Sequence, residues 1–116
     1  MKISVIGAGY VGLISALCLA YKGHEVFIVE KNLSVVKMIN SGIPHIYEEG
    51  LKELLTNVIK LNRFKATSDL DQALSSSEVA IIAVGTPSKD GNINLEYIEK
   101  VTRDIGRFIR NVAVFS

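Results

Sequence analysis

The sequence predicts an α/β fold in which a doubly wound parallel sheet is covered by helices on both faces. Strand-like and helix-like segments alternate along the whole chain, and such alternation is typical of parallel sheets. The residues Gly7-Ala8-Gly9-Tyr10-Val11-Gly12 match G-x-G-x-x-G between the first strand-like run and the first helix-like run. Glu30 ends the second strand-like run, about 20 residues further on, where this class of fold carries an acid.

The individual elements follow from hydrophobic spacing and from flanking residues. Apolar runs predict strands at 3–6, 25–30, 64–67, 79–84 and 112–115. Helical spacing predicts helices at 11–22, 48–61 and 94–110, and two shorter helices that end near 40 and 74. Gly23 ends the first helix, Asn32 or Ser34 caps the second, and Ser68 or Asp69 caps the fourth. Right-handed crossovers would give the strand order 3-2-1-4-5, with a ligand crevice at the carboxyl ends of the first and fourth strands.

The chain ends at Ser116, just as the fifth predicted strand finishes. A complete sheet of this class carries a sixth strand. We therefore expect one domain, residues 1–116, that is the first part of a longer protein and whose sheet is truncated after the fifth strand.

The glycine motif predicts a Rossmann-type site for the pyrophosphate of a dinucleotide. Gly7 permits the sharp turn out of the strand, Gly9 lets the backbone approach the phosphates, and Gly12 lets the helix pack closely on the sheet. The first N–H groups of the helix, around Ala8, Tyr10 and Val11, would then face the phosphates. Tyr10 either covers the edge of the pyrophosphate or only packs. A tight turn without a ligand is the alternative for the whole motif.

Glu30 and its neighbour Lys31 are the candidate residues for the adenosine ribose. A carboxylate at the end of the second strand can accept hydrogen bonds from both ribose hydroxyls. Its charge also repels a 2′-phosphate, which favours NAD over NADP, although Lys31 weakens that argument slightly. The alternative is a glutamate that is merely exposed to water at the end of a strand.

Composition and charge exclude several other functions. Apolar residues make up 48% of the chain and the net charge is +1, so electrostatics favour neither nucleic acid nor an anionic membrane. No apolar run is long enough for a membrane span. The single cysteine, Cys18, precludes an internal disulfide and fits a cytoplasmic location; within its apolar helix we expect it to be buried.

The polar residues outside the motif predict no metal site, because the two histidines lack a ligand pattern. His24 is expected at the surface. His45, Tyr47, Glu48 and Glu49 form either a polar site or, as we favour, the solvated start of a helix.

The chain also resembles the UDP-glucose/GDP-mannose dehydrogenase family in three blocks that occur in the family's order. The blocks are residues 6–13 followed by 23–26, residues 39–42 followed by 46–51, and residues 84–88 followed by Asp90-Gly91 and Leu95. Residues 10–13 and 47–51 resemble most the members that act on UDP-glucose. The chain departs from the pattern at Val35, where a basic residue is usual; Lys31 and Lys37 are the alternatives for that basic residue. It departs again at His45 and Glu49, where prolines are usual.

The resemblance implies further site residues in the last third of the chain. Val84, Gly85, Thr86, Pro87 and Ser88 would line the adenosine and nicotinamide-ribose side of NAD, and Ser116 would match a serine that follows the fifth strand. Thr86 would supply a hydrogen-bonding side chain; from the residues alone, a simple Gly-Thr-Pro turn is an equal alternative.

The resemblance also implies an activity for the parent enzyme. It would oxidise the C6 hydroxyl of UDP-glucose to UDP-glucuronate with two NAD, in nucleotide-sugar metabolism and polysaccharide biosynthesis. A central dimerising region and a C-terminal UDP-sugar domain would follow this domain and would carry the catalytic cysteine, lysine and asparagine. The chain alone would then contain no catalytic residue and be inactive, and the protein would be a homo-oligomer. The alternatives are a GDP-mannose or UDP-N-acetylmannosamine dehydrogenase, or a free-standing module that senses NAD(H).

Overall fold

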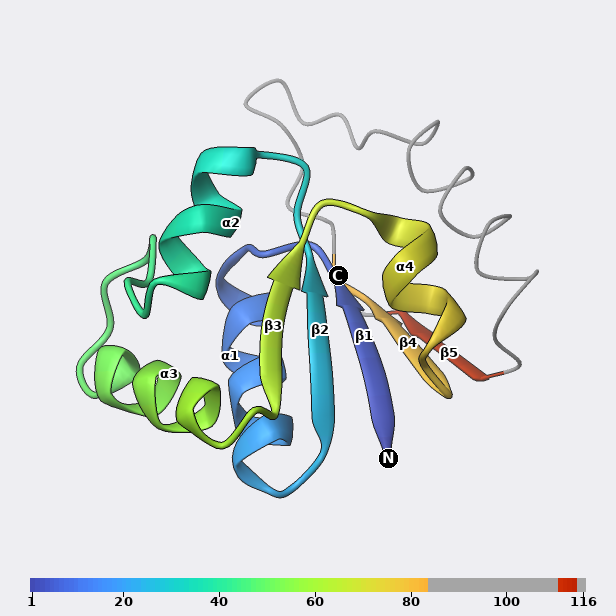
Figure 1. Cartoon of the computed structure of the whole chain (residues 1–116), viewed down its shortest axis with the longest axis horizontal. Helices are drawn as coiled ribbons and strands as arrows, with labels where there is room; N and C mark the ends of the chain where they lie inside the picture. Colours follow the sequence, from blue (N-terminus) through green and yellow to red (C-terminus); the bar gives the residue numbers. More distant parts are fainter. Residues whose placement is uncertain (84–110, 115–116) are drawn as a thin grey trace.

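The computed structural model describes residues 1–83 and the backbone of residues 111–114. Five parallel strands form one sheet in the order β3-β2-β1-β4-β5 (Figure 1). Their bounds are β1 Lys2–Ile6, β2 Glu25–Val29, β3 Phe64–Thr67, β4 Val79–Ile82 and β5 Asn111–Val114. The predicted strand order is therefore confirmed. The predicted helix at 94–110, the loop at 84–88 and residues 115–116 lie outside the described residues.

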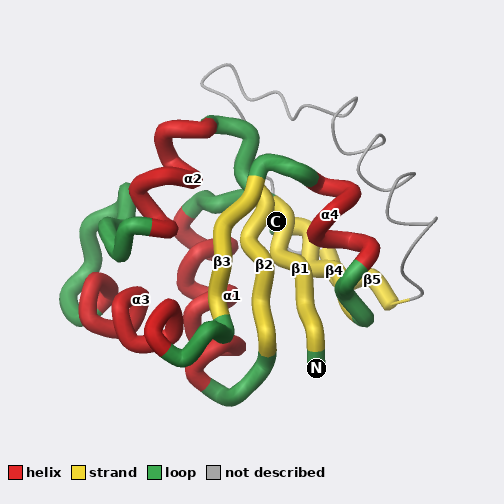
Figure 2. The backbone as a smooth tube through the Cα atoms, in the orientation of Figure 1, coloured by secondary structure: helices red, strands yellow, loops and turns green. Residues whose placement is uncertain are grey.

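Helices cover both faces of the sheet, as expected for a doubly wound fold (Figure 2). Helices α1 (Tyr10–Tyr21) and α3 (Leu51–Lys60) pack on one face, with α2 (Leu33–Asn40) beside β3. The short helix α4 (Leu70–Ser75) packs on the other face. Crossover helices between parallel strands give this layered arrangement because each helix returns the chain to the amino end of the sheet.

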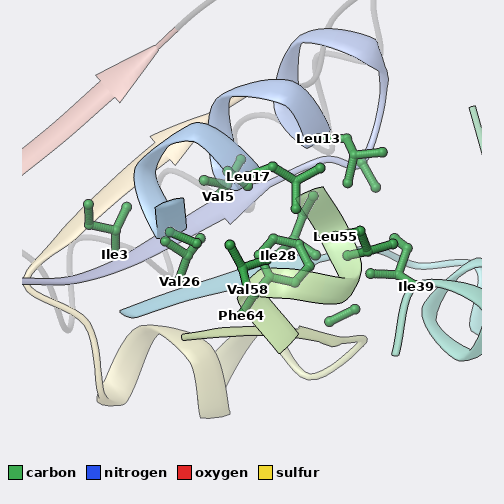
Figure 3. Close-up of a cluster of buried hydrophobic side chains, with 14 of the residues drawn as sticks. Ile3, Val5, Leu13, Leu17, Val26, Ile28, Ile39, Leu55, Val58 and Phe64 are labelled. Atoms are coloured by element: carbon green, nitrogen blue, oxygen red, sulfur yellow. The ribbon is translucent and has the colours of Figure 1, made fainter. Parts of the chain in front are cut away.

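The main core lies between the sheet and helices α1 and α3. Alternate strand residues such as Val5 and Ile28 point to this face, where they meet Leu13 and Leu17 of α1 (Figure 3). All four side chains have no exposed area, and burial of each contributes roughly 1.5–3 kcal/mol. The strand residues between them, including Ile6 and Val29, point to the opposite face and pack against α4. The strands are therefore apolar on both faces, which is typical of parallel sheets.

The capping residues resolve two alternatives that the sequence left open. The Asn32 side chain accepts a hydrogen bond from the Ser34 N–H at 3.0 Å, so Asn32 caps α2. The Asp69 side chain accepts one from the Gln72 N–H at 3.1 Å, so Asp69 caps α4. Gly23 has a φ of 109° directly after the C-cap of α1, which confirms it as the residue that ends this helix.

Two expectations about the helices are wrong. Helix α3 begins at Leu51 rather than at residue 48, because Gly50 adopts a left-handed φ of 82° that a helix cannot include. Cys18 is exposed rather than buried. The residues of α1 that face the sheet are Leu13, Ala16, Leu17 and Ala20, and Cys18 lies about 100° around the helix from Leu17, away from them.

The outer edge of β3 is covered by a side chain from α2. The Asn40 Nδ2 donates to the Ala66 carbonyl at 2.9 Å, and the Asn40 Oδ1 accepts from the Ala66 N–H at 2.8 Å. The backbone N–H and C=O groups of Ala66 point away from β2, because only every second residue of β3 forms hydrogen bonds with that neighbouring strand. Asn40 thus supplies the two hydrogen bonds that a further strand would supply.

Candidate functional site

The glycine turn lies at the carboxyl end of β1, between β1 and α1. Gly7 has a φ of 106°, a conformation that other residues rarely adopt. Its N–H donates to the Val29 carbonyl at 2.9 Å, which ties the turn to the end of β2. The Ala83 N–H likewise donates to the Ile6 carbonyl at 2.9 Å, so the chain leaves β4 at this same edge of the sheet.

Gly9 and Gly12 have opposite surroundings. A Cβ atom on Gly9 would have no atom of residues 1–83 within 4 Å, so the described part of the chain leaves the space in front of the turn open. A Cβ atom on Gly12 would lie 2.0 Å from the Gly7 carbonyl oxygen, so α1 packs on the turn too closely for any side chain. Gly9 therefore leaves room for a ligand, whereas Gly12 serves packing.

The start of α1 offers hydrogen-bond donors to that open space. The N-cap is Gly9, no side chain within residues 1–83 caps the helix, and its first turn contains no acidic residue. The first N–H groups of a helix have no acceptor within the helix, and they carry a partial positive charge. Tyr10 and Val11 are 54% and 50% exposed. This end of the helix is suited to an anion such as a pyrophosphate.

Glu30 lies directly after β2 and reaches the glycine turn. One carboxylate oxygen accepts from the Ala8 N–H at 3.4 Å, and the other accepts from the Asn32 N–H at 2.9 Å. The side chain is half-buried. Each carboxylate oxygen can accept more than one hydrogen bond, so both remain able to bind the hydroxyls of a ribose. Lys31 follows Glu30 and is exposed.

Both alternatives for the segment before α3 are partly met. The His45 Nε2 lies 2.5 Å from the Ala8 carbonyl oxygen, and the Tyr10 hydroxyl donates to the Glu48 carboxylate at 3.4 Å, so two of its residues contact the turn. Glu48 is also exposed, as expected for residues just before a helix. Residues 8 and 45 are separated by 37 positions, so no local spacing could have indicated this contact. Tyr47 and Glu49 are exposed.

His24 is half-buried rather than at the surface, and its Nδ1 has no partner among the described residues. His24 lies beyond the C-terminal end of α1, far along the helix from the glycine turn, and its backbone N–H donates to the Leu19 carbonyl. Among the described residues, no cluster of His, Cys, Asp or Glu could hold a metal ion. Within the same part of the chain, no helix is long and apolar enough to cross a membrane. Val84, Gly85, Thr86, Pro87 and Ser116 lie outside the described residues.

Cavity size does not single out this site. Hollows of about 480, 540 and 560 Å³ lie on the described part of the molecule, and none of them is lined by a residue of the glycine turn. The hollow of about 540 Å³ is the one nearest to the turn in its lining, because it includes His45 and Glu48. The carboxyl edge of the sheet is nevertheless where ligands bind in this fold class, because the turns and helix N-termini gather there.

A strand–glycine turn–helix unit with a carboxylate at the end of the next parallel strand defines a Rossmann-type dinucleotide-binding domain. Residues 1–116 match the model of the UDP-glucose/GDP-mannose dehydrogenase family, NAD binding domain. The chain belongs to this family and corresponds to the NAD-binding domain of its members.

Relatives with two different substrates in their names are similar to this chain. GDP-mannose 6-dehydrogenase of Pseudomonas putida is 45% identical over 112 residues, which cover 96% of this chain and 26% of that protein. UDP-glucose 6-dehydrogenase of Rhizobium meliloti is 40% identical over 116 residues, 98% of this chain and 26% of that protein. The crystal structure of a ternary complex of GDP-mannose dehydrogenase from Pseudomonas aeruginosa superposes with a TM-score of 0.83 at 44% identity, covering 91% of this chain and 24% of that one. The chain thus spans about a quarter of the length of these relatives.

Proposed function

We propose that this domain holds NAD⁺ for a nucleotide-sugar 6-dehydrogenase, with the cofactor lying across the glycine turn. The observation that carries the proposal is the position of the Glu30 carboxylate beside the Ala8 N–H, next to the open space at Gly9. This arrangement provides a donor-rich end for the pyrophosphate and, after the neighbouring strand, an acceptor for the ribose.

Each proposed contact has its own physical role. The N–H groups at Tyr10 and Val11 would bind the pyrophosphate oxygens, because the helix dipole adds a favourable field there. The Glu30 carboxylate would accept from the two hydroxyls of the adenosine ribose and repel a 2′-phosphate. Residues 84–87 and Ser116 are proposed from the family resemblance to complete the site. The bound cofactor would supply the hydride acceptor.

Two sugar nucleotides are candidates for the substrate of the parent enzyme. The motifs at residues 10–13 and 47–51 favour UDP-glucose, which would be oxidised at C6 to UDP-glucuronate with two NAD⁺ reduced. The relatives named GDP-mannose 6-dehydrogenase reach 45% identity, against 40% for a UDP-glucose relative, and this favours GDP-mannose. We propose that residues outside this chain make the choice and carry the catalytic groups, so the chain alone would be inactive. A cytoplasmic location and a homo-oligomer belong to the same proposal.

The NAD⁺ site can be tested by calorimetry on the 116-residue chain with NAD⁺ and NADP⁺. Glu30→Ala should raise the Kd for NAD⁺ roughly ten- to hundred-fold, because it removes charge-assisted hydrogen bonds to the ribose. It should raise the Kd for NADP⁺ much less, since the repulsion of the 2′-phosphate disappears at the same time. Glu25→Ala, at the exposed far end of β2, is the matched control and should change neither affinity. Equal losses for both cofactors would remove Glu30 from its proposed role.

The parent activity requires the complete protein. A coupled assay should record two NAD⁺ reduced for each sugar nucleotide consumed, with UDP-glucose and GDP-mannose supplied separately. Turnover of one of them decides the substrate. NAD⁺ binding without turnover of UDP-glucose, GDP-mannose or UDP-N-acetylmannosamine would instead favour a module that senses NAD(H).

A further inference from the structure

His45 is the residue from outside the glycine motif that holds the backbone of the turn. Its ring reaches from the segment between α2 and α3 to the Ala8 carbonyl, with 2.5 Å between Nε2 and the oxygen. A carbonyl oxygen can only accept, so the Nε2 atom carries the proton and donates it. The Nδ1 atom is buried and has no partner among the described residues, so the ring makes its hydrogen bond through Nε2.

This hydrogen bond orients the peptide group that joins Ala8 to Gly9. The Ala8 carbonyl and the Gly9 N–H belong to one planar trans peptide, so they point in opposite directions. When His45 fixes the carbonyl on one side, the Gly9 N–H is fixed on the other side. The next peptide is held in the same way, because the Gly9 carbonyl accepts from the Leu13 N–H at 2.9 Å. The N–H groups of Gly9 and Tyr10 are thereby given fixed directions.

Two further contacts show that the turn is held from several elements. The Ala8 N–H donates to Glu30 after β2, and the Tyr10 hydroxyl donates to Glu48, three residues after His45. Of these, only the His45 contact fixes a carbonyl of the turn from another segment of the described chain. A turn rich in glycine has many accessible conformations, so this external hydrogen bond reduces the cost of ordering it when a ligand binds.

We propose that His45 is a positioning residue for cofactor binding: it presents the Gly9 N–H to the pyrophosphate by holding the Ala8 carbonyl. The proposal rests on the proposed NAD⁺ site. It adds to that site a residue from the segment between α2 and α3, which lies outside the glycine motif.

The test compares three variants of the 116-residue chain by calorimetry with NAD⁺. His45→Ala removes the donor and should raise the Kd for NAD⁺ about fivefold, the effect of one neutral hydrogen bond. His45→Gln carries an N–H donor at a similar distance from the backbone and should restore most of the affinity. His24→Ala is the matched control, because His24 is also half-buried with an unpartnered Nδ1 but lies at the other end of α1. It should leave the Kd unchanged.

Nuclear magnetic resonance supplies a measurement that loss of stability alone would not change. In the wild-type chain, the ring nitrogen shifts of His45 should report a proton on Nε2, and NAD⁺ should shift the Gly9 amide signal. In His45→Ala that amide shift should shrink, and in His45→Gln it should return. An unchanged Kd and an unchanged Gly9 shift in His45→Ala, with wild-type binding intact, would overturn the role of His45. Failure of the wild-type chain to bind NAD⁺ would instead overturn the proposed function.

Discussion

At the scale of single residues, the three motif glycines are not equivalent. Gly7 is required by its φ of 106°, whereas Gly9 has an ordinary φ of −72°. Alanine could adopt the backbone conformation of Gly9, so the only property that favours glycine there is the space that a side chain would fill. Gly12 lies in a helix, where alanine is intrinsically better by about 1 kcal/mol, and is retained because the Gly7 carbonyl occupies the place of a Cβ atom. Glycine is thus needed for a different reason at each motif position: for backbone conformation at Gly7, for ligand access at Gly9 and for close packing at Gly12.

Alanine at Gly9 and at Gly12 should therefore give opposite results. Gly9→Ala should leave the free energy of unfolding unchanged within about 0.5 kcal/mol, yet weaken NAD⁺ because the methyl group enters the space of the phosphates. Gly12→Ala should destabilise the fold by about 1–3 kcal/mol, because backbone must move to accommodate the Cβ atom. Urea unfolding and calorimetry on both variants measure the two effects. A destabilised Gly9→Ala that binds NAD⁺ normally would show that the open space has no role in binding.

At the scale of elements, Asn40 joins the end of α2 to the edge of the sheet. An edge strand has unpaired N–H and C=O groups that can recruit another chain. The side-chain amide of Asn40 satisfies both groups of Ala66 at once, and alanine can satisfy neither. The same contact holds α2, and hence the segment that carries His45, in a set position relative to the sheet.

Asn40→Ala should lower the free energy of unfolding by about 1–2 kcal/mol, from the loss of two partly buried hydrogen bonds. Asn57→Ala is the control, because Asn57 is exposed on α3 and alanine favours a helix. Chemical denaturation of both variants measures the difference. If Asn40→Ala were as stable as Asn57→Ala, the amide would not be an energetic link between α2 and β3.

At the scale of the whole molecule, apolar side chains are exposed near the glycine turn. Tyr47 is 94% exposed, and Tyr10, Val11 and Ile43 are each about half exposed. Exposed apolar surface at the functional end of a domain marks a place where another surface or a ligand docks. The family resemblance implies a homo-oligomeric parent protein, and this surface is the part of the described domain through which such association can be tested.

We expect the chain to self-associate through the surface around Tyr47. Size-exclusion chromatography over a range of concentrations should give an apparent mass above that of a monomer. Tyr47→Lys should shift the equilibrium towards monomer, whereas Tyr21→Lys, 61% exposed at the other end of α1, should not. A monomer at every concentration would contradict this self-association, and equal effects of both lysines would contradict the choice of surface.

Much of the fold could be predicted from local patterns. Alternating periodicities located the described strands and helices to within a few residues, and the strand order followed from the fold class. The errors have local causes: the start of α3 depends on the left-handed φ of Gly50, and the exposure of Cys18 depends on which side of α1 faces the sheet. A uniformly apolar helix does not reveal that side, because its hydrophobic residues surround the whole axis.

The sequence by itself determined the class of fold, the family and the glycine turn, because spacing within a short segment decides strand, turn and helix. Only the tertiary structure decided which atoms surround that turn. The contact from His45 to Ala8 and the two bonds from Asn40 to Ala66 join residues 37 and 26 positions apart. Folding of the chain brings these distant groups together, and the hydrophobic periodicity of the sequence does not indicate such contacts.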